Sequence, residues 1–106
     1  KTVVKENANG GKGQVVEKYI LDDNELNAKC KMFAEVTIAP DVPWAIMAHG
    51  ESGTYYIIKG QGEYDDNGTK RPVTVGDKTF TPDGCGHGIA NTGDEDLVFM
   101  ALIQLD

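Results

Sequence analysis

The stretch from Gly76 to Asn91 (GDKTFTPDGCGHGIAN) constrains the fold most strongly, because it combines two turn signals with three short β-rich runs. Gly76-Asp77 separates two of these runs, and glycine supplies a positive φ angle without a Cβ clash. Pro82-Asp83-Gly84 predicts a second turn, since proline presets φ at one corner and glycine relieves the other. His87 follows this corner and opens a strand that ends at Asn91. The stretch therefore predicts three strands and two turns, with a histidine near one mouth of a β-barrel or inside it.

The rest of the chain also consists of short β-rich runs separated by turn signals. Lys31–Ala39 alternates with period two, and Thr54–Lys59 is rich in β-forming residues. Asp65–Gly68 predicts a hairpin turn because it contains Asn-Gly, and Pro72 favours an edge strand because proline has no N–H to donate. No window shows a sustained apolar period of about 3.6 residues, so helix content should be low. About eight to ten short strands with closely spaced turns predict an all-β sandwich or barrel.

The size and charge of the chain narrow the classes of protein further. A chain of 106 residues suits one domain, which we divide into an N-terminal arm over residues 1–12, pairing late or not at all, and a barrel over 13–106. The net charge of −7 argues against a nucleic-acid partner or an anionic membrane surface. No apolar run approaches the roughly 18 residues that span a bilayer. Two cysteines are too few for a disulfide framework, which indicates a cytoplasmic protein.

The glycine, proline and histidine spacing of the opening stretch resembles the second conserved motif of the cupin superfamily. That motif has five fixed positions, and this chain matches all of them with Gly76, Pro82, Gly84, His87 and Asn91. The resemblance covers roughly residues 40–91 and implies an all-β, double-stranded β-helix, the jelly-roll or cupin barrel.

The first cupin motif is present in a degenerate form. His49 and Gly60 match it, whereas Asp41, Met47 and Gly53 stand where the family has a glycine, a histidine and a glutamate. In the family, the two histidines and the glutamate of this motif join the histidine of the second motif on one metal ion. Of those four ligands the chain retains two.

A carboxylate beside His49 could complete the site. In a regular strand Met47, His49 and Glu51 lie on one face, so Glu51 could approach the metal. His49, Glu51 and His87 are then the predicted ligands, a set suited to iron or another transition metal. The resemblance implies Mn, Fe, Ni, Cu or Zn, and a metal-free site is the alternative.

Two functions stay open, and no catalytic residue is assigned. The first is a metal-assisted isomerase, decarboxylase or dioxygenase acting on a small polar metabolite such as a sugar acid, as the intact second motif and His49 favour. The second is a metal-free cupin that binds a carbohydrate or similar small molecule, as Met47 and Gly53 favour. In either case we expect the ligand cavity to be lined by Trp44, Met47, Tyr55 and Phe80.

The C-terminal run predicts a homodimer. Leu97–Leu105 is apolar on both faces of the expected strand. One face can pack the core, and the other would leave an unusual apolar area on a small monomer.

Overall fold

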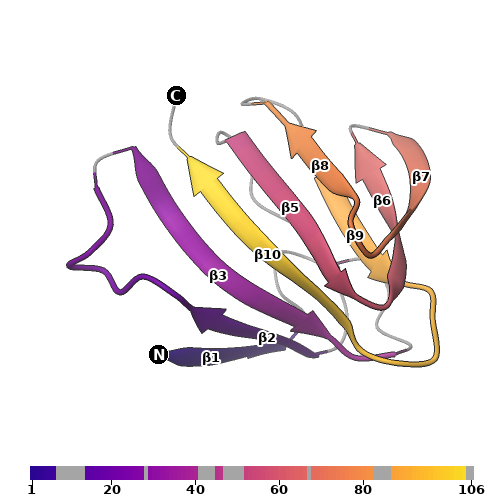
Figure 1. Cartoon of the computed structure of the whole chain (residues 1–106), viewed down its shortest axis with the longest axis horizontal. Helices are drawn as coiled ribbons and strands as arrows, with labels where there is room; N and C mark the ends of the chain where they lie inside the picture. Colours follow the sequence, from indigo (N-terminus) through magenta and orange to yellow (C-terminus); the bar gives the residue numbers. More distant parts are fainter. Residues whose placement is uncertain are drawn as a thin grey trace.

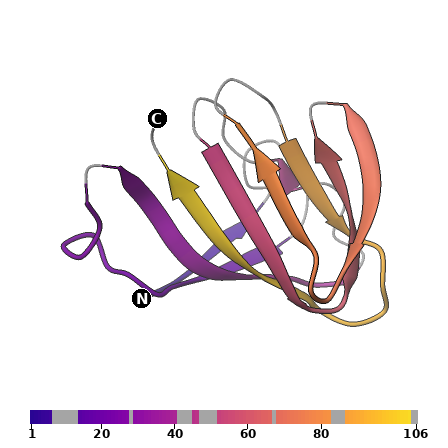
Figure 2. The same ribbon diagram turned by 45° about the horizontal axis from the view of Figure 1, so that its top comes forward.

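The chain forms two antiparallel β-sheets that face each other across a buried core (Figure 1). The computed structural model describes residues 1–6, 14–27, 29–40, 45–46, 52–66, 68–82 and 87–104. Figure 2 shows the same two sheets curving around the core after a 45° turn. The described residues contain no helix, and so none that could cross a membrane. The all-β prediction is confirmed.

The strands divide unequally between the two sheets. The six-stranded sheet has the order β1 (Thr2–Glu6), β2 (Gln14–Tyr19), β3 (Cys30–Ile38), β10 (Leu97–Gln104), β5 (Ser52–Lys59) and β8 (Lys78–Thr81). The four-stranded sheet has the order β4 (Ala45–Ile46), β9 (His87–Asn91), β6 (Gln61–Asp66) and β7 (Thr69–Thr74). Neighbours such as β3 and β10 are far apart in sequence, as a jelly roll requires.

The turns follow the local sequence signals. Gly68 has φ 99° between β6 and β7, and its N–H donates to Asp65 Oδ1 at 2.8 Å. Gly76 has φ 90° between β7 and β8, and its N–H donates to the Ile57 carbonyl at 2.9 Å. Pro72 lies in β7, the edge strand of its sheet. These three predictions are confirmed. The corner predicted at Pro82–Gly84 lies largely outside the described residues.

The N-terminal arm contributes a strand. Thr2–Glu6 pairs antiparallel with β2 at the edge of the larger sheet, from Thr2 opposite Lys18 to Glu6 opposite Gln14. The predicted boundary between residues 12 and 13 falls outside the described residues, so it stays a prediction.

Asn91 joins the two sheets at one end of the barrel. Its side chain is 7% exposed, and Nδ2 donates to the Ile38 carbonyl at the end of β3 at 2.9 Å and to the Glu95 carbonyl at 2.8 Å. Its Oδ1 accepts from the Gly93 N–H at 2.9 Å. We call this the Asn91 end, and the opposite one, where β9 begins, the His87 end.

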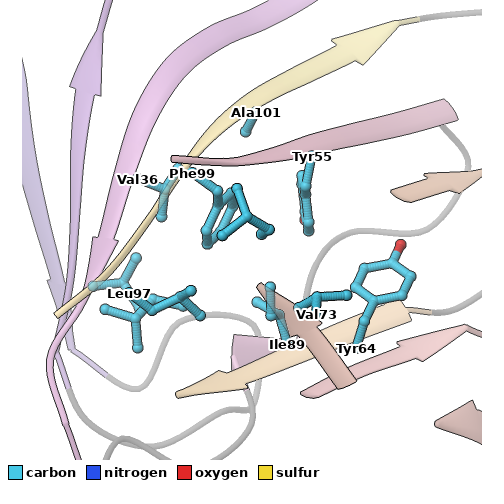
Figure 3. Packing of buried hydrophobic residues seen from close by; sticks show 11 residues of the cluster. Val36, Tyr55, Tyr64, Val73, Ile89, Leu97, Phe99 and Ala101 are labelled. Atoms are coloured by element: carbon cyan, nitrogen blue, oxygen red, sulfur yellow. The ribbon is translucent and has the colours of Figure 1, made fainter. Parts of the chain in front are cut away.

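The core fills the space between the sheets. Its members come from both sheets and are at most 2% exposed: Val15, Val36, Ile38, Tyr55, Ile57, Tyr64, Val73, Ile89, Leu97, Phe99 and Ala101 (Figure 3). Alternation along β10 assigns its two faces, since Leu97, Phe99 and Ala101 are buried. Ile103 continues this face and packs against the core cluster, whereas Val98, Met100 and Leu102 point away from it.

The outer face of the six-stranded sheet carries an apolar patch. One cross-strand row places Phe33, Leu102, Thr54 and Phe80 side by side. The next row brings Met100 beside Tyr56. Phe80 is 51% exposed and Tyr56 is 49% exposed. Large apolar side chains gathered in this way favour an interface.

We predict that a second copy of the chain covers this patch, and that Leu102→Glu yields monomers. The substitution places a charge in the middle of the apolar row, where burial without a partner is costly. Light scattering at micromolar concentration measures the mass. Val75→Glu, at a turn residue that is 59% exposed, is the matched control and should leave the mass unchanged. A monomer mass for the unsubstituted chain would contradict the prediction.

Candidate functional site

The predicted metal ligands lie at the limit of what the structure describes. His49 and Glu51 are outside the described residues, as are Trp44 and Met47. His87 is the first residue of β9 and is paired with Asp66 at the end of β6. Its strand neighbour Ile89 is fully buried. The convergence of His49 and His87 therefore stays a prediction.

The two predicted cavity residues with described side chains lie on opposite faces of their sheet. Tyr55 is 1% exposed and points into the barrel. Phe80 points outward, so the prediction that it lines the interior is wrong. The physical reason is alternation along β8, where Thr79 and Thr81 are both fully buried and Phe80 lies between them.

The interior changes character along the barrel. Near the Asn91 end, the cross-strand row of the larger sheet that points into the barrel consists of Val15, Ile38 and Leu97. The second inward-pointing row after this one, counted toward the His87 end, consists of Tyr19, Ala34, Ala101, Tyr55 and Thr79. The row nearest the His87 end includes Gly53 opposite Thr81. On the β5–β8 side, aliphatic side chains thus give way to hydroxyl groups and a glycine, whereas Met32 and Ile103 continue the apolar lining on the β3–β10 side.

Three hydroxyl side chains gather at the His87 end, which we call the hydroxyl cluster: Tyr64, Thr79 and Thr81. The Tyr64 and Thr81 hydroxyls are hydrogen-bonded to each other across the two sheets. The Tyr64 ring stands edge-on to that of Tyr55, with ring centroids 5.8 Å apart. In Figure 3 the Tyr64 oxygen points away from Leu97 and the aliphatic side chains around it.

Burial raises the pKa values of three phenols further above physiological pH. It raises the pKa of Tyr55 well above its ordinary value of 10.0, with smaller contributions from Tyr64 and Glu17. Burial also raises the pKa of Tyr64, while the hydroxyls of Thr81 and Thr79 lower it by less. The pKa of Tyr19 rises to about 12, first through burial and then through its hydrogen bond to Glu17. All three therefore act as neutral O–H groups at physiological pH.

The interior has little positive charge of its own. Every lysine and arginine side chain that the structure describes is exposed. The buried charged side chain of this part of the chain is Glu17, 4% exposed, which accepts a hydrogen bond from Tyr19 Oη at 3.0 Å. Arg71 lies at the seam between the sheets, where its Nη2 donates to the Lys78 carbonyl at 3.3 Å.

The described residues do not form a metal site by themselves. Among them no three His, Cys, Asp or Glu side chains come together as a set of ligands. A metal site in this barrel must therefore draw on residues beyond the described ranges, which include His49 and Glu51.

The sequence reasoning missed the hydroxyl cluster and Glu17. A signal for the threonines was present, because Lys78 must face solvent in the run KTFT and strand alternation then turns Thr79 and Thr81 inward. Glu17 has the same parity as Val15 in β2, which places it on the buried face. The parity of β8 places Phe80 on the outer face, although an aromatic side chain favours an interior position.

The matches to known proteins agree with this architecture. Residues 34–103 match the family described as the Cupin_2 cupin domain. The chain belongs to the cupin family. The predicted family and the predicted jelly roll are confirmed, and the cupin match extends beyond the motifs on which the resemblance rested.

One curated protein and one crystal structure, both from Thermotoga maritima, are similar to this cupin over most of its length. The oxalate-binding protein is 39% identical over 100 residues, covering 93% of this chain and 83% of that protein. A crystal structure of a predicted oxalate decarboxylase is 36% identical with a TM-score of 0.91, covering 100% of this chain and 93% of that one. The cupin domain of Schizosaccharomyces pombe Cnp3 has a TM-score of 0.78 at 12% identity, covering 98% of this chain and 69% of that one, so it shares the fold alone.

We predict that the free energy of unfolding falls above about pH 10. The unfolded chain releases its phenolic protons near that pH, whereas the raised pKa values of Tyr55, Tyr64 and Tyr19 keep them in the folded state. Unfolding then releases protons, so a stability that is constant below this window is lost as the pH rises through it.

Urea unfolding between about pH 8 and pH 11 measures this loss. Tyr55→Phe removes one of the phenols and should make the loss smaller. An unfolding free energy that stays constant up to about pH 11 would show that these phenols titrate in the folded state as they do in the unfolded chain.

Proposed function

We propose that this cupin binds a small carboxylate of the oxalate class inside its barrel, at the His87 end. The observation that carries the proposal is the 39% identity to the oxalate-binding protein over 93% of the chain. The interior supports it in part, because the hydroxyl cluster places neutral O–H groups beside the apolar core cluster. Carboxylates accept hydrogen bonds of this kind strongly.

A buried dianion also needs positive charge. Desolvation of an unpaired carboxylate costs more than hydrogen bonds return, and the described lysine and arginine side chains are exposed. We therefore propose that His49, Glu51 and His87 hold a divalent transition metal. Bound there, the metal would supply the positive charge that the ligand needs. The role of the chain is to orient the ligand and to exclude water around it.

Decarboxylation is the second candidate, because a solved structure at 36% identity is named a predicted oxalate decarboxylase. The reaction breaks the C–C bond of hydrogen oxalate to give CO2 and formate, so a proton must be delivered to carbon. Tyr55 and Tyr64 are poor proton donors, since their pKa values are raised by burial. Among the described groups the chemistry therefore favours binding over turnover.

Calorimetry with oxalate tests the proposal on protein purified without a His tag. We expect oxalate to bind when Mn, Fe, Ni or Zn is present and to raise the melting temperature by mass action. Metal stripping should remove the binding. No heat of binding in the presence of any of these metals would refute the proposal, and equal affinity without metal would establish the metal-free alternative. Formate in the same mixture would establish the decarboxylase.

We predict that His87→Ala abolishes both the metal-induced rise in melting temperature and oxalate binding. The metal-free fold should persist, because His87 stands at the end of β9 rather than in the core cluster. The effect of metal should also fade below about pH 6, since imidazole must be neutral to coordinate. Asp94→Ala, an exposed substitution at the Asn91 end, is the control and should change neither quantity. Full metal and oxalate binding by His87→Ala would exclude this histidine from the site.

A further inference from the structure

We infer that the outer face of the six-stranded sheet pairs with a second copy of this chain about a two-fold axis that runs along the strands, between β10 and β5. The dimer predicted from the apolar patch leaves the arrangement of the two copies open, and the charges beside the patch select one. In this arrangement Lys78 contacts the partner's Glu35, and symmetry forms the reverse contact at the same time. The inference is independent of the proposed ligand.

Opposite charges lie on the two sides of the apolar patch. Glu35 is in β3 and Lys78 is in β8, the outer two of four strands that lie side by side in Figure 1. Glu35 is half-buried and Lys78 is exposed, and neither side chain makes an ion pair with another described residue. Both belong to one outward-pointing row, which consists, in strand order from β2 to β8, of Lys18, Glu35, Met100, Tyr56 and Lys78.

Two-fold symmetry restricts how two such faces can meet. When the axis runs along the strands, every residue keeps its level along the sheet while the strand order is reversed. Packed sheets keep their strands within about 30° of each other, so the rows of the two copies stay matched near the axis. An axis between β10 and β5 brings β8 over the partner's β3, and β5 over the partner's β10. Lys78 then faces the partner's Glu35, and Phe80 faces the partner's Phe33.

Other positions of the axis place the charges less favourably. An axis along β10 brings Lys78 over the partner's Lys18. An axis between β3 and β10 brings Glu35 over the partner's Met100. An axis across the strands through this row lays each strand over itself, so that like charges meet at both edges. Contact between like charges and burial of a charge without a partner both cost free energy, which leaves the axis between β10 and β5.

Charge reversal tests this arrangement. Glu35→Lys and Lys78→Glu each turn two attractive contacts of the dimer into two repulsive ones. Each should raise the dimer dissociation constant about tenfold or more, as measured by sedimentation at low ionic strength. The double variant Glu35→Lys/Lys78→Glu should recover the affinity of the unsubstituted chain. A mixture of the two single variants should also form dimers, because both contacts of the mixed dimer join opposite charges. The repulsion in each single variant should weaken in about 1 M salt.

Glu63→Lys is the matched control. Glu63 is a half-buried glutamate in β6, in the other sheet, and its substitution changes the net charge by the same amount as Glu35→Lys. This variant should dimerise like the unsubstituted chain.

The outcomes separate the arrangement from the dimer itself. Unchanged dimer affinity in both single variants, or a double variant as weak as the single ones, overturns the arrangement while the dimer stands. A monomeric unsubstituted chain refutes both. If Glu35→Lys does not fold, Glu35→Gln replaces it and is combined with Lys78→Glu. Glutamine removes the repulsion, so this pair should dimerise more tightly than Lys78→Glu alone, and equal affinity overturns the inference.

Discussion

The hydrogen bonds of the Asn91 side chain determine how the two sheets meet. One buried amide is anchored to the end of β3 in the larger sheet and to the turn that leads into β10. Glycine permits close approach at the same end, because a Cβ on Gly62 would lie 2.5 Å from the Ala90 carbonyl oxygen and one on Gly60 would lie 2.5 Å from that of Asp96. The two sheets therefore approach each other through backbone contacts at this end, and the ligand site that we propose lies at the opposite one.

The two ends of the barrel interior differ in polarity. Aliphatic side chains near the Asn91 end supply burial without any hydrogen-bonding requirement. Toward the His87 end, each buried hydroxyl needs a partner, and Tyr64 and Thr81 meet that need through each other. The same hydrogen bond connects the four-stranded and six-stranded sheets. This hydrogen bond therefore ties the hydroxyl cluster to both sheets.

Local features of the fold could be predicted from sequence, and pairings between distant strands could not. Gly76 and the hairpin at Asp65–Gly68 are set by a few neighbouring residues, and both appear as expected. Phe80 was misplaced because its hydrophobicity suggested burial, whereas the parity of β8 is decided by the two threonines around it. No spacing in the sequence brings Tyr64 to Thr81, since that contact depends on the two sheets packing together. The prediction for His49 and Glu51 rests on motif spacing alone.

Strand β8 connects the two proposed surfaces. It is an edge strand, paired with β5 through four residues, and its inward threonines belong to the hydroxyl cluster while Phe80 belongs to the outer patch. A ligand on one face and a second copy of the chain on the other would each hold the same short edge in place. If each binds the ordered strand more tightly than the frayed one, then linkage requires that each strengthens the other by the same factor. Dimer affinity should therefore rise when oxalate is bound, and sedimentation of the chain with and without oxalate measures that coupling. Equal dimer affinity in the two conditions would show that β8 is already ordered before either partner arrives.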